Sequence, residues 1–363
     1  MDIKRNILLN PGPATTTDTV KRAQLVPDIC PREREFGDLM RELGTDLLKV
    51  VHADPADWTT VLFCGSGTIA MDACVSSLIP ADGKLLIVNN GAYSARAAEM
   101  ARAYSVPHID LKFPIDGLPD LDVVEQTLRE HPEIAAVYTT HQETGTGILN
   151  PVREIGALAH THSAVMIADT ISTYAMIPFT ADDMNIDVCM SSAQKGIQGM
   201  TGLSYVLAKK SVLNAAKAYP VRSYYTNLIM QYEGFEQTGE MRFTPPVQTV
   251  YAAKRALAEY FAEGASKKWA RHTRTIEAIH EGLERLGLKE AIPRAIQSEL
   301  VVAVEYPADF DFLRVHDYCY ERGYTIYPGK MQTSSTFRLC ALGAIDAPDI
   351  AGFFRVFEEA LKA

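Results

Sequence analysis

The chain has 363 residues, of which 47% are hydrophobic and 22% are charged, with a formal net charge of -10 at pH 7. This composition is typical of a globular protein with a sizeable core and excludes a disordered or fibrous chain. The acidic excess argues against nucleic acid or an anionic membrane as a partner, so an anionic ligand has to bind in a local basic pocket.

The sequence also predicts where the protein is found. No apolar run approaches the roughly 20 residues of a membrane-spanning helix, and the first residues lack the pattern of a signal peptide. The six cysteines are scattered without a CxxC pair, which predicts buried free thiols in a reducing compartment. We therefore expect a soluble, cytoplasmic protein.

From about residue 59, short apolar runs alternate with longer helical patterns. This rhythm predicts an α/β/α sandwich around a mostly parallel sheet. The expected strands are 59–63, 84–88, 135–139, 165–168, 186–191 and 203–207, and the expected helices are 68–78, 92–104, 121–130 and 152–160.

The last third of the chain has a different pattern, typical of a smaller α+β domain. Thr-Pro-Pro at 244–246 interrupts any helix and predicts a seam between the domains. After it we expect one or two helices over 247–286, strands at 299–305 and 336–340, and helices at 310–322 and 347–361. The predicted domains are an N-terminal segment of residues 1–16 that packs with the small domain, a large domain of residues 17–250 and a small domain of residues 251–363.

A glycine-rich turn, Phe-Cys-Gly-Ser-Gly-Thr at 63–68, follows an expected strand and precedes an expected helix. Backbone N–H groups at such a junction, together with the hydroxyls of Ser66 and Thr68, can bind a phosphate dianion. The turn is neither a Walker sequence nor a dinucleotide fingerprint, because it lacks the lysine of the first and the third glycine of the second. An ordinary turn with a helix cap would look alike, so this motif alone leaves both interpretations open.

Two further strands end in residues that can carry chemistry. One ends at Asp169, at the edge where α/β sheets bind ligands, although a carboxylate there can also simply cap a turn. Another leads to Lys195, which stands among small, apolar and amide residues in the run 190–199. A lysine in a surface loop is the ordinary alternative, but surface loops seldom surround a lysine with such residues.

Together the three motifs predict a pyridoxal 5′-phosphate (PLP) site. PLP needs a phosphate cup, a carboxylate for the pyridine nitrogen and an amine for the aldehyde. The chain offers these groups, in this order, at the ends of expected strands. We predict that Lys195 forms the Schiff base and moves the substrate proton, and that Asp169 keeps the pyridine nitrogen protonated.

The chain also resembles a known family, the class V, fold-type I aminotransferases. Within that class, LLNPGPATTT at 8–17 and the stretch 28–33 are most similar to the 2-aminoethylphosphonate:pyruvate transaminases. The resemblance runs from residue 8 to 343, and it implies transfer of the amino group of 2-aminoethylphosphonate to pyruvate in a homodimer with shared active sites. The motifs that carry it are GSGT (65–68), NGAYSAR (90–96), HQETGTG (141–147), ADT (168–170), SSAQKGIQG (191–199) and FRLCALG (337–343).

The resemblance implies a role for each matching residue. Ser66, Gly67 and Thr68 would hold the cofactor phosphate, Tyr93 would stack on the ring, and Ile171 would contact the ring from below. Of these, Tyr93 could instead be only an aromatic residue of the core.

Four more matching residues complete the predicted site. Thr144 would lie near the ring oxygen, Gln194 beside the ring or the phosphate, and Thr244 would reach the phosphate of the other subunit. Arg338 would bind the acidic group of each substrate, with help from Arg32, because the planar guanidinium fork suits carboxylate and phosphonate oxygens. A strand-edge salt bridge is the alternative for Arg338.

Three other functions stay open. The first is an alanine or serine aminotransferase with glyoxylate or pyruvate as acceptor, which needs only a carboxylate pocket. The second is a PLP lyase or cysteine desulfurase, although a desulfurase needs a mobile cysteine and Cys319 and Cys340 lie in expected regular elements. The third is a non-catalytic phosphate-binding module. No metal is expected, because His160 and His162 are two residues apart and would point to different faces of a helix.

Overall fold

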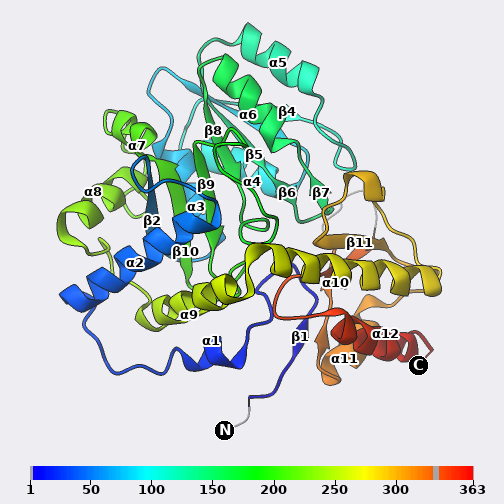
Figure 1. The fold of residues 1–363 in the computed structure, drawn as a ribbon. Helices are drawn as coiled ribbons and strands as arrows, with labels where there is room; N and C mark the ends of the chain where they lie inside the picture. Colours follow the sequence, from blue (N-terminus) through cyan, green and yellow to red (C-terminus); the bar gives the residue numbers. More distant parts are fainter. Residues whose placement is uncertain (1–2, 330–334, 363) are drawn as a thin grey trace.

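The computed structural model describes residues 3–329 and 335–362, so the extreme ends of the two outer predicted domains lie outside the described residues. Figure 1 shows a large part built on a central sheet and a smaller part that holds the last helix. The central sheet has seven strands in the order β2-β10-β9-β8-β5-β3-β4. These strands are β2 (Trp58–Cys64), β3 (Lys84–Asn89), β4 (His108–Lys112), β5 (Ile134–Thr140), β8 (Val165–Asp169), β9 (Val188–Ser192) and β10 (Leu203–Lys209).

The sheet is mostly parallel, as predicted. Only β10 runs antiparallel to its neighbours, β2 and β9. The pairs β3–β4, β3–β5, β5–β8 and β8–β9 are all parallel. The ends of β5, β8 and β9 therefore lie at the same edge of the sheet.

Helices cover both faces of this sheet, because alternate residues of each buried strand point to opposite sides. Leu86 and Val88 of β3 belong to one core, whereas Leu85 and Ile87 belong to the other. The first core also contains residues of α2 (Arg34–Val50), α5 (Leu121–Glu130), α6 (Val152–Thr161) and α9 (Val247–Glu263). The second contains residues of α3 (Gly67–Ser77), α4 (Ala92–Ala103), α7 (Lys210–Ala216) and α8 (Leu228–Thr238).

A third core, rich in phenylalanine, holds the C-terminal part together. Phe337, Phe353 and Phe357 are completely buried there, and Ile7 and Leu9 from the start of the chain join them. The elements of this part are β1 (Ile7–Leu8), β11 (Val301–Glu305), β12 (Tyr324–Thr325), β13 (Tyr327–Pro328), β14 (Thr336–Cys340), α10 (Ala265–Arg285), α11 (Phe312–Glu321) and α12 (Ala347–Lys362). Short elements elsewhere are α1 (Asp18–Arg22), β6 (Gln142–Glu143), β7 (Ile148–Leu149) and a 3-10 turn at Arg294–Ile296.

The expected strands and helices are confirmed to within about two residues at most ends. The helical stretch 247–286 is two helices, because Gly264 at φ +83° separates α9 from α10. Helices α2 and α8 and the edge strand β4 were not predicted. The domain boundaries after residues 16 and 250 remain a proposal, although β1 pairs with β12 of the C-terminal part.

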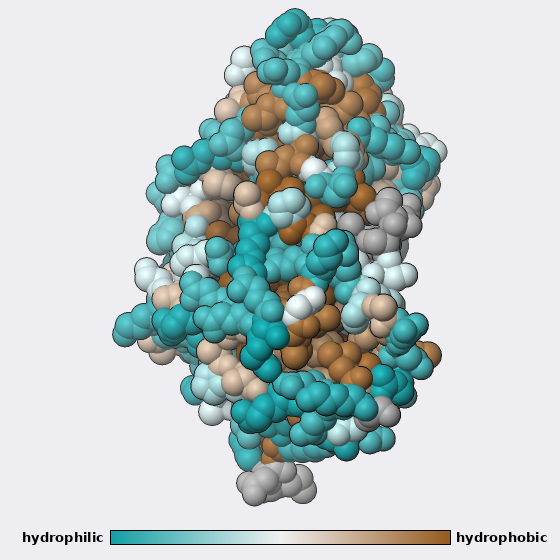
Figure 2. Space-filling model, turned by 90° about the vertical axis from the view of Figure 1, so that its right-hand side faces the viewer, coloured by the Kyte–Doolittle hydropathy of each residue, from teal (hydrophilic) through white to brown (hydrophobic). Residues whose placement is uncertain are grey.

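The structure also shows the exposure of the cysteines and the character of the surface. All six cysteines are free, but Cys30 is exposed and Cys64 is half-buried, so the prediction of buried thiols was wrong for these two. Within residues 3–329 and 335–362 no helix combines the length and the apolar character that crossing a membrane requires. Figure 2 shows the face on the side of the C-terminal part, where hydrophilic residues dominate and hydrophobic ones gather in two areas.

Candidate active site

A cavity of about 210 Å³ lies at the edge of the sheet where β5, β8 and β9 end. Nine of the twelve predicted site residues line it, although they come from five separate stretches of the chain. They are Ser66, Gly67, Thr68, Tyr93, Thr144, Asp169, Ile171, Gln194 and Lys195.

The start of α3, which lines the cavity, is suited to an anion. Ser66 is the N-cap residue of α3 but makes no side-chain capping bond there, and Gly67 and Thr68 begin the helix. The first N–H groups of a helix have no partner within the helix and carry a partial positive charge. Arg96 adds a full positive charge, because its Nη1 donates to the Thr68 hydroxyl over 3.3 Å.

Arg96 also contacts Tyr93, one turn before it on α4. The guanidinium carbon lies 5.0 Å from the centre of the Tyr93 ring, within the range of a cation–π contact. Arg96 belongs to the motif at 90–96 but was not predicted as a site residue. The signal was available, because residues three apart on a helix share a face.

Glu143 fixes the helix that carries Tyr93. Its carboxylate accepts the backbone N–H groups of Tyr93 and Ser94, over 3.1 and 2.7 Å, and the Ser94 hydroxyl over 2.6 Å. Glu143 is fully buried, and burial raises its pKa. Burying a carboxylate is costly unless it is hydrogen-bonded, so these three donors explain its place at the start of α4.

Asp169 ends β8 inside the protein. Its carboxylate accepts the Ile171 backbone N–H over 2.9 Å and the Tyr138 hydroxyl over 3.2 Å. Burial nevertheless raises the pKa of Asp169 to about 6. A cationic group placed in the cavity beside this carboxylate would lower that pKa again and offset the cost of burial.

Lys195 lies in a loop of residues 193–199, called the lysine loop below, which follows β9. Its amine donates to the backbone carbonyl of Pro11. Gly12 lies against the same side chain, at φ +128°, and a methyl group added to Gly12 would stand 2.6 Å from Cε of Lys195. The N-terminal segment therefore closes the cavity over the lysine, and only glycine fits at position 12.

Three predicted residues lie outside the cavity lining. Arg338 on β14 is buried, and it donates to the carbonyl of Thr144 over 3.0 Å and to that of Pro328. It thus lies directly behind the cavity wall. Arg32 is bonded to Glu240 and to the Met241 carbonyl, and Thr244 is exposed.

Three residues that line the cavity carry buried polar atoms with no hydrogen-bond partner among the described residues. These atoms are Oγ1 of Thr140, Oε1 of Gln142 and Oε1 of Gln194. Such atoms are destabilising unless a ligand or water pairs with them. An anion site, a buried carboxylate, an amine and unsatisfied polar atoms around one cavity fit PLP, which carries a phosphate, a basic ring nitrogen, an aldehyde and a ring hydroxyl.

Other chemistry finds less support. Cys319 in α11 and Cys340 in β14 are buried, and burial raises their pKa to about 11 and about 12. Thiols held in this way are poor nucleophiles, which disfavours a desulfurase. His160 is bonded to Asp187 over 2.8 Å, and no cluster of three or more metal-ligating side chains occurs in the part of the chain that the structure describes.

The chain belongs to the class V aminotransferases, whose family model matches residues 26–339. Members of this class are PLP-dependent, so PLP is the cofactor that the site is built for. Among solved structures, the alanine–glyoxylate aminotransferase of a Nostoc species superposes with a TM-score of 0.90 at 24% identity, over 99% of this chain and 96% of that one. This likeness establishes fold type I.

Relatives with higher identity carry a narrower name. A 2-aminoethylphosphonate–pyruvate transaminase of Lactiplantibacillus plantarum is 36% identical, over 95% of this chain and 94% of its own length. Another, of Cupriavidus necator, is 34% identical over 98% of this chain and 94% of its own length.

The raised pKa of Asp169 gives a prediction about stability. Between about pH 4 and pH 6 the folded protein keeps a proton on this carboxyl that the unfolded chain has lost, so stability falls as the pH rises. Above that range the full cost of the buried charge, about 2–3 kcal/mol, applies. We expect D169N to stabilise the cofactor-free protein more at about pH 8 than at about pH 5, as measured by chemical denaturation. An equal effect at both pH values would contradict this account.

The contact between Gly12 and Lys195 gives a second prediction. G12A should lower the affinity for PLP at least about tenfold and the free energy of unfolding by about 1–3 kcal/mol, because the added methyl group meets the lysine side chain and the backbone is strained. G264A is the matched control, since Gly264 also has positive φ (+83°) but has nothing within 4 Å of an added methyl group. Cofactor titration should separate the two variants, and equal PLP affinities would show that the contact is unimportant.

Proposed function

We propose that this chain transfers the amino group of 2-aminoethylphosphonate to pyruvate, giving phosphonoacetaldehyde and L-alanine. The observation that carries the proposal is that Lys195, Asp169 and the start of α3 meet at one cavity in a class V aminotransferase. The choice of substrates is supported by relatives of this name that match nearly the whole chain at 32–36% identity.

Bound PLP supplies an aldehyde that takes up the amino group and a ring that withdraws electrons from the carbon that loses its proton. In our proposal the Lys195 amine holds the cofactor covalently. When it is not bonded to the cofactor, Nζ of Lys195 would act as the base that takes the proton from the amino-bearing carbon and as the acid that later returns one. The hydrogen bonds from Tyr138 and Ile171 orient the carboxylate of Asp169. This carboxylate would hold the proton of the ring nitrogen.

The remaining residues bind and orient the cofactor. We assign the phosphate to the N-terminus of α3 with Ser66, Gly67 and Thr68, and we add Arg96 because its guanidinium contacts Thr68. The other assignments are the upper ring face to Tyr93, the lower ring face to Ile171, the ring oxygen to Thr144 and the edge of the ring or phosphate to Gln194.

Arg338 remains our candidate for the acidic group of each substrate. Its guanidinium already reaches the backbone of Thr144 at the cavity wall, which supports this assignment. Arg32 is a weaker candidate, because its side chain is bonded to Glu240 and lies 43% exposed. A phosphonate carries more charge than a carboxylate, so the substrate choice depends on the number of cationic donors near the cavity.

The first test combines a label with a spectrum. Borohydride treatment of the native holoenzyme should fix the cofactor to Lys195, as peptide mapping would show, and a label elsewhere or none would refute the site. Adding 2-aminoethylphosphonate alone should remove the absorbance of the lysine-bound cofactor. Alanine and serine with glyoxylate serve as comparison: turnover of these without turnover of the phosphonate would identify an alanine or serine aminotransferase instead.

We further propose a homodimer in which Thr244 reaches the phosphate bound to the other subunit. Thr244 is exposed and follows Arg242 and Phe243, which pack with the exposed rings of Tyr224 and Tyr225. Exposed aromatic groups of this kind favour contact with a partner surface. A cytoplasmic location, supported by the free cysteines, is also part of the proposal.

The dimer can be tested with T244A. We expect this variant to bind PLP about tenfold more weakly while sedimenting as a dimer like the wild type, because one charge-assisted hydrogen bond to the phosphate is lost. T161A is the matched control, since Thr161 is exposed at the end of α6 and its hydroxyl, among the described residues, bonds only the Ala157 carbonyl of its own helix. A monomeric wild type in analytical ultracentrifugation, or equal PLP affinities of T244A and T161A, would refute the shared site.

A further inference from the structure

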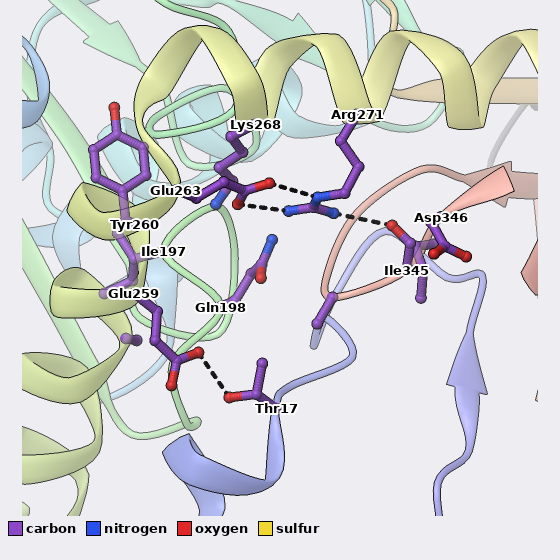
Figure 3. Close-up of a pocket in the computed structure, with 12 residues that line it drawn as sticks. Thr17, Ile197, Gln198, Glu259, Tyr260, Glu263, Lys268, Arg271, Ile345 and Asp346 are labelled. Atoms are coloured by element: carbon purple, nitrogen blue, oxygen red, sulfur yellow. Dashed lines mark hydrogen bonds and ion pairs between the residues drawn. The ribbon is translucent and has the colours of Figure 1, made fainter.

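A second cavity, of about 360 Å³, borders the lysine loop through Ile197 and Gln198. It shares no lining residue with the first cavity. Figure 3 shows Lys268 and Arg271 of α10 on one side of it, with the carboxylate of Glu263, the last residue of α9, bonded to the Arg271 guanidinium. Arg271 is fully engaged, because it binds Glu263 with two donors and the carbonyls of Gly343 and Ile345 with a third.

Lys268 is held differently from Arg271. Only 2% of it is exposed, and its amine donates to the carbonyl of Gly196, the residue directly after Lys195. The amine also lies 5.3 Å from the centre of the Tyr260 ring. On its other side Gly196 packs so closely on the carbonyl of Tyr174 that any side chain would collide with it. Gly196 is therefore fixed between Lys268 and Tyr174.

The position of Lys268 is unfavourable for a lysine that serves packing alone. It stands in the first turn of α10, where the helix dipole disfavours a cation. Burial, and after it the charge of Arg271, lowers its pKa to about 7. None of the salt bridges among residues 3–329 and 335–362 includes it. Lysines are almost never fully buried without an ion-pair partner, and such exceptions usually serve function.

The lysine loop transmits the position of Gly196 to Lys195. The Lys195 N–H donates to the Ser192 carbonyl over 3.1 Å, the Gln198 N–H to the Lys195 carbonyl over 2.9 Å, and the Gly199 N–H to the Ala193 carbonyl over 2.7 Å. The loop is thus a closed turn, in which a displaced Gly196 carbonyl moves the backbone of Lys195. A displacement of about 1 Å in a catalytic group can cost about a hundredfold in rate.

We propose that Lys268 is a positioning residue for Lys195: its amine holds the Gly196 carbonyl and thereby fixes the loop that presents the Lys195 amine to the first cavity. The inference rests on Lys195 carrying the cofactor, as proposed above. Lys268 itself contacts neither cofactor nor substrate in this account.

The test uses K268M, which keeps the bulk of the side chain and removes the donor. In the cofactor-free protein we expect the Gln198 and Gly199 amides to exchange hydrogen about tenfold faster than in the wild type, because the turn loses its outer support. In the holoenzyme, kcat should fall about tenfold to a hundredfold with KM changing less than about threefold. The absorbance of the lysine-bound cofactor should also titrate at a different pH.

Two variants serve as controls. K254M removes a lysine of α9 that is ion-paired with Asp46 over 2.6 Å and with Glu42, and it should leave both amides and kcat unchanged. K268R keeps a donor, and the adjoining cavity has room for its larger head group, so it should recover part of what K268M loses.

The proposal would be overturned if the Gln198 and Gly199 amides of folded K268M exchanged hydrogen at the same rate as in the wild type. If K268M does not fold, K268A decides, because alanine has no side-chain donor, and wild-type exchange of both amides there would have the same meaning. Failure of the proposed function is recognised separately, by the absence of a borohydride label on Lys195 of the wild type, whereas the exchange experiment needs no cofactor.

Discussion

The arrangement of the active site depends on how the chain holds the lysine loop. Three segments far apart in the sequence contact it: the N-terminal segment through Pro11 and Gly12, the connection after β8 through Tyr174, and α10 through Lys268. Most of these contacts involve backbone carbonyls or glycines, so the space around the loop leaves little room for change. A lysine amine on a free loop would sample many positions, and fixing it in one of them would cost conformational entropy. Here rigid neighbours already fix the loop in the folded protein.

The charged groups of the cavity are fully stabilised only by a ligand that carries both an anionic and a cationic group. The start of α3 and Arg96 provide positive charge at the cavity, whereas Asp169 provides a buried carboxylate. Without a ligand the Asp169 carboxyl is destabilising, as its raised pKa shows. A ligand with a phosphate and a protonated ring nitrogen would pair with both groups, so cofactor binding and folding stability are coupled.

Much of the fold was predictable, because buried parallel strands give continuous apolar runs and their helices alternate with them. Helix α2 was missed although Phe36, Met40, Leu43 and Leu47 repeat at helical spacing, whereas the edge strand β4 is only half-buried and has no such pattern. Residues at strand ends that line the cavity could be predicted, since topology brings strand ends together. Gly12, Glu143 and Lys268 could not, because each acts on a segment far from it in sequence and only the tertiary structure pairs them.

The N-terminal segment connects the two parts of the molecule at the lysine. Leu9 bonds to Thr325 and Cys340 in the C-terminal part, over 2.9 and 3.0 Å, while Ala14 bonds to the Gln194 carbonyl over 2.9 Å. Only residues 10–13 separate these anchors, and two of them are prolines, whose fixed φ makes the segment stiff. Because Cys340 ends the strand that carries Arg338, these four residues are the direct covalent connection between the residue bonded to that strand and the residue bonded to the loop that carries Lys195. The C-terminal part is thus connected to the lysine loop in two ways. One is the N-terminal segment, and the other is α10, which contacts both the lysine loop and the segment after β14.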